Sequence, residues 1–435
     1  MRYLFLMSGL AVSLLVQAVS IQAAEMALPV NSLPQLVATA LADNPELKVS
    51  DARWKMFASR AKQAGSLEDP MLMLKAQNLL VRDPFTFNRD ATTAKVIGIS
   101  QQLPFWGKRA LREEIANLEA ESYRQSIEER KLELARMVKE TWYQLYATDK
   151  SLAIIEKNLK IMDDFLTIAE TRYAVGQGAQ ADIYKAGLEK SKMLDMQISL
   201  RQKRTSLAAN LNYLLYRPGS TPVPPIPDFP LPELTQTVDK LNVLAQENRP
   251  QVKSLLAQAG KGNAARRLAH KEFWPDVNVS FEYMFRESVQ NSMTTDPGYN
   301  MFTLGLTFNL PVQRDRRQAM LAESSSETAM ATDELNSLKN SISYIINDSL
   351  AQLERRKRLV ELYKGGIIPQ AEQALESALI GYRVNKVDFV TLLDGRVSLF
   401  NYERELYESQ AEYMMVLARL EAAVGVELVS ESQRQ

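Results

Sequence analysis

Gln102-Leu-Pro-Phe-Trp-Gly-Lys-Arg109 marks the change from a strand-like segment to a long helical one, and Asn309-Leu-Pro-Val312 marks the same change about 207 residues later. Other paired landmarks keep a similar spacing of 205 to 209 residues: Asn44-Pro45 with Arg249-Pro250, and Tyr173-Ala-Val-Gly176 with Tyr382-Arg-Val-Asn385. A duplication of this size indicates two equivalent units around one axis. We therefore expect residues 25–216 and 241–426 to be two structural repeats. Each should contain a short helix, two strands, a very long helix, a turn and a long helix.

The composition favours long helices over an enzyme-like domain. The 435 residues include 52 Lys+Arg, 52 Asp+Glu and only 17 Gly, a mixture typical of helical proteins. The balanced charge does not indicate a nucleic-acid partner. The chain has no cysteine and one histidine, His270, which argues against a thiol or imidazole nucleophile and against a Cys/His zinc site. We predict that the chain is not an enzyme, and we assign no catalytic residue, metal ligand or cofactor.

The N-terminus has the pattern of a secretory signal peptide. Arg2 precedes an apolar stretch that runs to Ala18, and small residues at Ala23 and Ala24 offer a cleavage site. We expect residues 1–24 to be removed, with a membrane anchor as the alternative. Because no cysteine follows the site, we expect that the mature chain is not a lipoprotein. No later stretch approaches the roughly 18 apolar residues that a membrane-spanning helix needs.

Four segments alternate apolar and polar residues with a period of two. The pattern is clear at 277–285 and 302–310 and weaker at 72–75 and 97–102. Segments of about ten residues suit tilted transmembrane strands, and a half-buried soluble sheet is the alternative. Aromatic pairs, Phe105-Trp106 and Phe273-Trp274, fall at the same end of these strands, as an interfacial girdle requires.

The number of strands predicts an oligomer. A closed barrel needs roughly eight strands, and an open sheet edge is not tolerated in lipid. One chain therefore supplies part of a barrel that other copies complete. Three copies would give about twelve strands and two copies about eight, the smallest barrel that can close.

Helical patterns cover most of the remaining chain. They run from Phe105 to about Arg172 and from Val312 to about Tyr382, with Gly365-Gly366 and Pro369 expected to bend the second helix locally. Apolar residues recur with heptad spacing, which indicates helices supercoiled side by side. The two heptad series are Leu152, Ile155, Leu159, Met162, Leu166, Ala169 and Tyr173, and Leu399, Leu406, Tyr413 and Leu420. Residues 217–240 are proline-rich and read as an extended strap between the repeats. Residues 427–435 form a C-terminal tail.

Taken together, the duplicated turns resemble those of the TolC-type outer-membrane efflux protein family over essentially the whole mature chain. The resemblance implies a mixed α and β fold of mostly long helices, in which a homotrimer forms an α-helical barrel and a twelve-stranded outer-membrane β-barrel. It also implies an exit duct in the outer membrane of a Gram-negative bacterium, projecting into the periplasm. Its expected partners are a periplasmic adaptor (a membrane fusion protein) and an inner-membrane pump, for example a resistance-nodulation-division transporter.

The resemblance also implies a gate where the long helices turn. Family members carry two pore-facing aspartates in the second tip, and the matching positions here are Thr391 and Asp394. Asp388, one turn earlier, is the candidate replacement for the carboxylate missing at Thr391. Asp182 matches an aspartate of the family's gating network, and Tyr382 matches a tyrosine that locks the resting state. The alternative for each aspartate is an ordinary helix-start residue, because Asp favours the first helical turn.

The same turns are where the family docks its adaptor. The corresponding residues here are Gly176, Gln177, Gly178, Asn385 and Lys386, although the hydrophobic residue usual in this motif is absent. The Leu-Pro-Phe-Trp-Gly-Lys and Gly-Gly-Ile-Ile-Pro segments look most like the heavy-metal-efflux branch. Cargo stays open between metal cation, drug and polypeptide. A type I secretion duct, a soluble periplasmic coiled-coil scaffold and an enzyme with an unrecognised carboxylate site are the alternatives.

Overall fold

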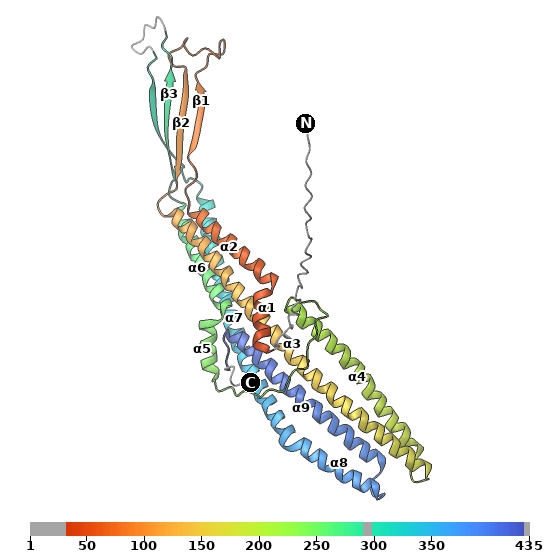
Figure 1. Cartoon of the computed structure of the whole chain (residues 1–435). Coiled ribbons are helices and arrows are strands. Elements are labelled where there is room, and N and C mark those ends of the chain that lie inside the picture. The colour runs from red at the N-terminus through yellow and green to blue at the C-terminus, as the bar shows by residue number, and fades with distance from the viewer. Residues whose placement is uncertain (1–31, 290–297, 430–435) are drawn as a thin grey trace, which may run out of the picture.

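The protein is elongated, with a small sheet at one end and two helical hairpins at the other (Figure 1). The computed structural model describes residues 32–289 and 298–429. The predicted signal peptide, part of the second strand-to-strand loop and most of the C-terminal tail lie outside these residues. Within the described residues, none of the helices is long and apolar enough to cross a membrane.

Both halves of the chain follow the same order of helices and strands, except that a π-helix divides the first long helix of the second half. The first half consists of α1 (Leu33–Asp43), α2 (Pro45–Gly65), β1 (Met71–Gln77), β2 (Ala94–Leu103), α3 (Lys108–Ala174) and α4 (Gln180–Leu214). The second half consists of α5 (Val238–Asn248), α6 (Pro250–Lys271), β3 (Val277–Arg286), β4 (Met301–Phe308), α7 (Arg314–Leu362), a π-helix η1 (Tyr363–Ile367), α8 (Ile368–Arg383) and α9 (Phe389–Val424).

The prediction of one short helix before each pair of strands is wrong, because each half has two helices there. The break falls at Asn44-Pro45 and at Arg249-Pro250. A residue before proline is pushed out of the helical region, and both Asn44 and Arg249 have extended backbones with ψ of 116° and 120°. Asn44 also accepts a hydrogen bond from the N–H of Glu46 at 2.8 Å, which caps the new helix.

The four strands form one antiparallel sheet in the order β1-β2-β3-β4, with β1 and β4 as its outer strands. Its two faces differ as the alternation predicts. One face carries cross-strand apolar neighbours, namely Leu72 and Leu74, Ile97 and Ile99, Phe281 and Tyr283, and Phe302 and Leu304. The opposite face is more polar and contains an ion pair between Lys75 and Glu282 at 2.7 Å. On the apolar face, Leu72, Leu74 and Leu304 are each about 70% exposed in the single chain.

A buried lysine fixes the junction between sheet and helices. Lys108, the first residue of α3, has a fully buried side chain whose Nζ lies 2.9 Å from Asp276 Oδ1 and 3.1 Å from Glu272 Oε2. Asp276 also accepts the Phe105 N–H at 2.7 Å. Phe105 stacks on Trp274 with ring centroids 5.2 Å apart, so the two predicted aromatic positions meet at this level.

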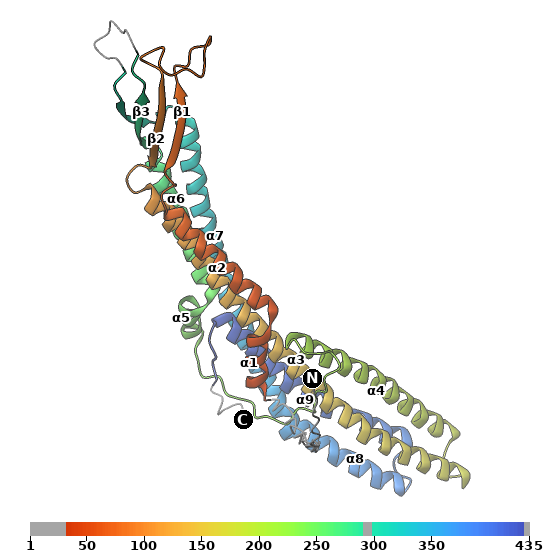
Figure 2. The same cartoon turned by 45° about the horizontal axis from the view of Figure 1, so that its top comes forward.

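The main core lies midway along the molecule, where α1, α5 and the segment between α4 and α5 pack against the long helices (Figure 2). The proline-rich segment packs through apolar residues such as Ile226 and Phe229 and is also held by hydrogen bonds. Tyr146 donates its hydroxyl hydrogen to Asp228 at 2.7 Å, and Tyr413 donates to the Pro232 carbonyl at 2.6 Å.

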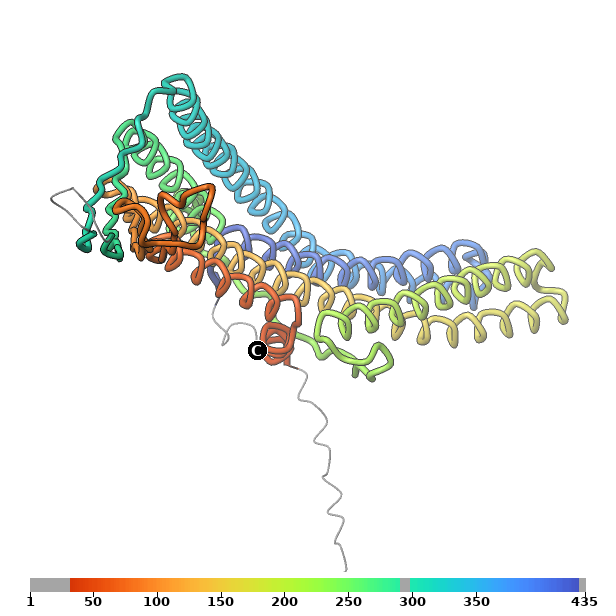
Figure 3. Tube along the Cα trace, turned by 90° about the horizontal axis from the view of Figure 1, so that it is seen from above, coloured from red at the N-terminus to blue at the C-terminus, as the bar shows by residue number. Residues whose placement is uncertain are grey.

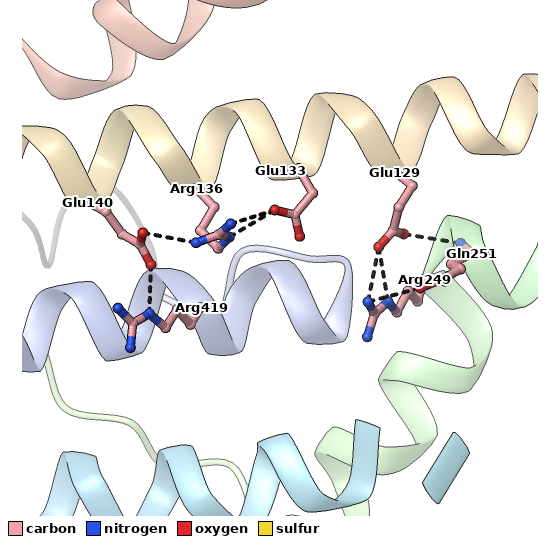
Figure 4. A network of polar contacts seen from close by, with 7 residues as sticks. All are labelled: Glu129, Glu133, Arg136, Glu140, Arg249, Gln251 and Arg419. Atoms are coloured by element: carbon pink, nitrogen blue, oxygen red, sulfur yellow. Dashed lines mark hydrogen bonds and ion pairs between the residues drawn. The ribbon is translucent and has the colours of Figure 1, made fainter. Parts of the chain in front are cut away.

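Ion pairs along α3 hold the middle of the bundle (Figure 4). Glu140 accepts from Arg136 at 2.9 Å and from Arg419 of α9 at 2.7 Å. Earlier in α3, Glu129 accepts from Arg249 and from the N–H of Gln251, which ties α3 to the start of α6. The network joins three helices that are far apart in sequence.

The heptad prediction holds for both series except at one residue. Leu399, Leu406, Tyr413 and Leu420 are all buried, and so are Ile155, Met162 and Ala169, while Leu152, Leu159 and Leu166 are half-buried. Tyr173 is 47% exposed, and its assignment to the seam is wrong. It occupies the last turn of α3, where the helix ends. The predicted bend around Gly365-Gly366 and Pro369 coincides with the π-helix.

Candidate functional site at the helical tips

The two hairpin tips lie at the same end of the molecule, farthest from the sheet (Figure 3). Each long helix ends in the same turn. Gln177 donates its N–H to Arg172 O at 2.8 Å, and Lys386 donates to Gly381 O at 2.8 Å. This is the Schellman motif, which needs a residue with positive φ just past the helix. Gly176 has φ of 71° and Asn385 has φ of 58°. Glycine and asparagine tolerate this left-handed backbone better than other residues, which explains why they occupy these two positions.

Gly178 adds a close approach to the first tip. A Cβ at this position would lie 3.1 Å from Arg172 Cβ and 3.2 Å from the Tyr173 nitrogen. The chain therefore passes closely over the end of α3 before α4 begins. Gln177, Asn385 and Lys386 are exposed at the outermost points of the two turns.

Tyr382 is buried between the tips, and its counterpart in the first repeat is not. Only 5% of Tyr382 is exposed, compared with 47% of Tyr173. Its ring lies 5.7 Å from that of Phe389, which in turn contacts Phe165 of α3 at 6.2 Å. Burial raises the pKa of the Tyr382 hydroxyl, Arg172 opposes this shift, and Asp182 adds to it.

Arg172 is the residue that reaches across from one tip to the other. Its guanidinium lies 4.1 Å from the centroid of the Tyr382 ring. It donates to Tyr382 O at 2.8 Å, to Arg383 O at 3.2 Å and to Asn385 Oδ1 at 2.8 Å. The first repeat thus supplies a cation to the carbonyl end of α8, where helical carbonyls lack intrahelical partners.

The three polar residues at the start of α9 share one exposed face. Asp388, Thr391 and Asp394 are spaced three residues apart and all are exposed. Asp388 is the N-cap of α9 and accepts the Thr391 N–H at 2.9 Å. Hydrogen bonds from Thr391 hold the pKa of the Asp388 carboxyl below its usual range. Asp388 therefore has a structural role as a helix cap, whereas Asp394 lies beyond the first turn.

Asp182 lies in the first turn of α4 and is half-buried. The negative charge of Asp182 raises the pKa of the Tyr382 hydroxyl. The structure therefore brings these two predicted residues near each other. Lys185 lies one turn further along α4, and its positive charge contributes to lowering the pKa of the Asp388 carboxyl. The tips thus bring acidic and basic side chains from both repeats close to one another.

Arg172 is not among the site residues predicted from the sequence. One signal was available, because basic residues in the last turn of a helix often bind its terminal carbonyls. That rule concerns the helix to which the residue belongs, and Arg172 instead serves the end of α8. The contact depends on how two hairpins more than 200 residues apart in sequence are placed side by side.

The outer membrane efflux protein family matches residues 36–215 and 241–426. The chain belongs to this family, which confirms the resemblance to TolC-type proteins drawn from the turns. The family and the fold are those of passive channels rather than enzymes.

A relative of known name shows which branch of the family this chain is similar to. The cobalt-zinc-cadmium resistance protein CzcC of Cupriavidus metallidurans is 23% identical over 429 residues, covering 96% of this chain and 97% of that protein. This relative confirms the expected likeness to the heavy-metal-efflux branch.

Solved structures show the same fold. The outer membrane protein VceC of Vibrio cholerae has a TM-score of 0.75 at 18% identity, covering 91% of this chain and 97% of its own. The open state of the MtrE outer membrane channel of Neisseria gonorrhoeae has a TM-score of 0.71 at 16% identity, covering 91% and 89%.

Proposed function

We propose that this protein is the outer-membrane exit duct of a tripartite efflux system. In this proposal the duct passively conducts cargo from an inner-membrane pump and a periplasmic adaptor to the cell exterior. Membership of the outer membrane efflux protein family supports the class of function. The arrangement of an apolar-faced sheet at one end and helical tips at the other supports the division of labour between membrane and periplasm.

One observation carries the proposal, namely the exposed apolar face of an open four-stranded sheet. In the single chain, Phe302, Leu304, Leu306 and Phe308 of β4 are 51–72% exposed. β1 and β4 form the two edges of the sheet, and a sheet edge in lipid must be paired. Pairing β4 of one copy with β1 of the next closes a barrel. We propose three copies, giving about twelve strands, with the apolar face toward lipid.

The helical tips are the proposed gate. Around a threefold axis, each exposed Asp394 would be repeated as a ring of three carboxylates, which attracts cations into a narrow mouth. Tyr382, Asp182, Asp388 and Thr391 belong to the same region. The turns with Gly176, Gln177, Gly178, Asn385 and Lys386 are the proposed adaptor-docking site.

For cargo, we propose divalent heavy-metal cations. The support is the likeness to CzcC, whose name describes resistance to cobalt, zinc and cadmium. The corresponding pump would be a proton-driven cation transporter of the resistance-nodulation-division class. Selectivity would reside in that pump, since the duct itself needs no cargo-binding site.

The test combines assembly and conduction. Purified protein in mild detergent should have the mass of a trimer, and in planar bilayers it should form channels with a reproducible unit conductance. A stable monomer inserted in lipid would contradict the architecture. For cargo, cells lacking the protein should become sensitive to cobalt, zinc or cadmium, while equal metal tolerance with altered drug tolerance would redirect the assignment to a drug pump.

A further inference from the structure

Arg172 joins the two helical tips by direct contact. It extends from the last turn of α3 and ends on the last turn of α8, where it meets one aromatic face and three oxygen acceptors. A planar guanidinium can stack and donate in its own plane at the same time, which a lysine ammonium cannot do. The contact is therefore specific for arginine.

The internal duplication provides a comparison within the same chain. The position equivalent to Arg172 in the second repeat is Gly381, and a side chain there would collide with Val387, whose Cγ2 lies 2.6 Å from the place of a Cβ. Position 381 therefore cannot supply the reciprocal arginine contact. Tyr173 is correspondingly exposed, whereas Tyr382 is buried. The two tips are built from equivalent turns, but among the described residues the equivalent arginine contact is made in one direction, from the first tip to the second.

The element that Arg172 contacts also follows an interruption of the α-helix at its other end, where Tyr363 packs against α9. α8 has only 16 residues and follows the π-helix at Tyr363–Ile367. A Cβ at Gly365 would meet nothing within 4 Å. In the first repeat, α3 continues unbroken over 67 residues to its tip. Short π-helical segments recur at functional sites in helices, and here one separates α8 from the long part of α7.

We infer that Arg172 is a positioning residue that holds Tyr382 and the end of α8 against α3 in the resting conformation. This inference rests on the proposed gate at the helical tips. When the contact is broken, the second-repeat tip is free to move about the π-helix, while the first-repeat tip stays in place. Tyr382 acts mainly as the surface on which the guanidinium stacks, through its ring and its backbone carbonyl.

The experiment compares variants of the full-length protein in planar bilayers without adaptor. Arg172→Gln should raise the resting open probability on the order of tenfold, the shift produced by losing about 1.4 kcal/mol of contact free energy. Arg172→Lys should give an open probability between those of Arg172→Gln and wild type, because lysine keeps the positive charge but lacks the planar guanidinium that stacks and donates at once. Tyr382→Phe keeps the ring and carbonyl and should change the open probability less than Arg172→Gln.

Two further variants serve as controls. Arg383→Gln removes the same charge from an exposed residue of the second-repeat tip and should leave the open probability unchanged. Asn385→Gly removes one acceptor of Arg172 but keeps the left-handed turn, since Gly176 has that role in the first repeat. It should raise the open probability slightly. The helix content and trimer mass of every variant are measured alongside.

The outcomes separate this inference from the function on which it rests. If the wild-type protein forms no channels, the proposed function fails. If it forms channels and Arg172→Gln behaves like Arg383→Gln, the inference is overturned and the duct stands. If Arg172→Gln does not assemble, Asn385→Gly decides the question, and an open probability equal to wild type in that variant overturns the inference.

Discussion

Replacing Leu304 by arginine tests the orientation of the sheet directly. Leu304 is 72% exposed in the single chain and lies opposite Phe281 on the apolar face. An arginine that faces lipid near the middle of the bilayer costs about 2–4 kcal/mol. Three copies in one barrel raise this to roughly 6–12 kcal/mol per trimer. We expect Leu304→Arg to block insertion, measured as loss of the heat-sensitive trimer band after refolding into lipid vesicles. Leu306→Arg should behave in the same way.

The adjacent residue is the matched control. Thr303 points to the other face and lies opposite Glu282, so an arginine there gains a nearby carboxylate and faces the proposed lumen. Thr303→Arg should assemble normally and change the unit conductance. Equal insertion of both variants, or equal failure, would falsify the assignment of the two faces.

Asp394→Ala is expected to weaken block by trivalent cations added from the periplasmic side without changing the trimer, measured by single-channel recording; block as tight as in wild type would place the carboxylate ring elsewhere. Asp388→Ala is expected to lower the melting temperature. Since hydrogen bonds from Thr391 hold the folded pKa of Asp388 below the ordinary value of an aspartate carboxyl, its stabilisation is present above that ordinary value and is lost as the pH falls through the folded pKa. The melting curves of the two proteins should therefore converge in acid, and a constant difference would contradict the cap. Lys108→Met leaves the partly buried Asp276 without its buried cation and should cost up to about 3–5 kcal/mol, seen as a lower trimer dissociation temperature; a difference near zero would show that the junction does not depend on this lysine.

The extent of regular structure could be predicted because it follows from local periodicity. A strand exposes alternate residues, so the series at 277–285 was visible from its own side chains. The bend in the second long helix was visible from Gly365-Gly366 and Pro369 for the same reason. The breaks at Asn44 and Arg249 were missed although proline marked both, because short apolar stretches on each side read as one helix. Tyr173 was misplaced because a heptad pattern does not show where the partner helix ends.

What the sequence determined by itself is the duplicated order of helices and strands, the two faces of the sheet and the left-handed residues at both tips, since each depends on residues only a few positions apart. The tertiary structure alone decided that Tyr382 is buried while Tyr173 is exposed, and that Arg172 rather than a tip carboxylate contacts the Tyr382 ring. These contacts join residues 210 positions apart. They depend on the relative placement of two helical hairpins, and small differences in helix packing angle move a side chain at the far end of a 67-residue helix by more than the length of a hydrogen bond.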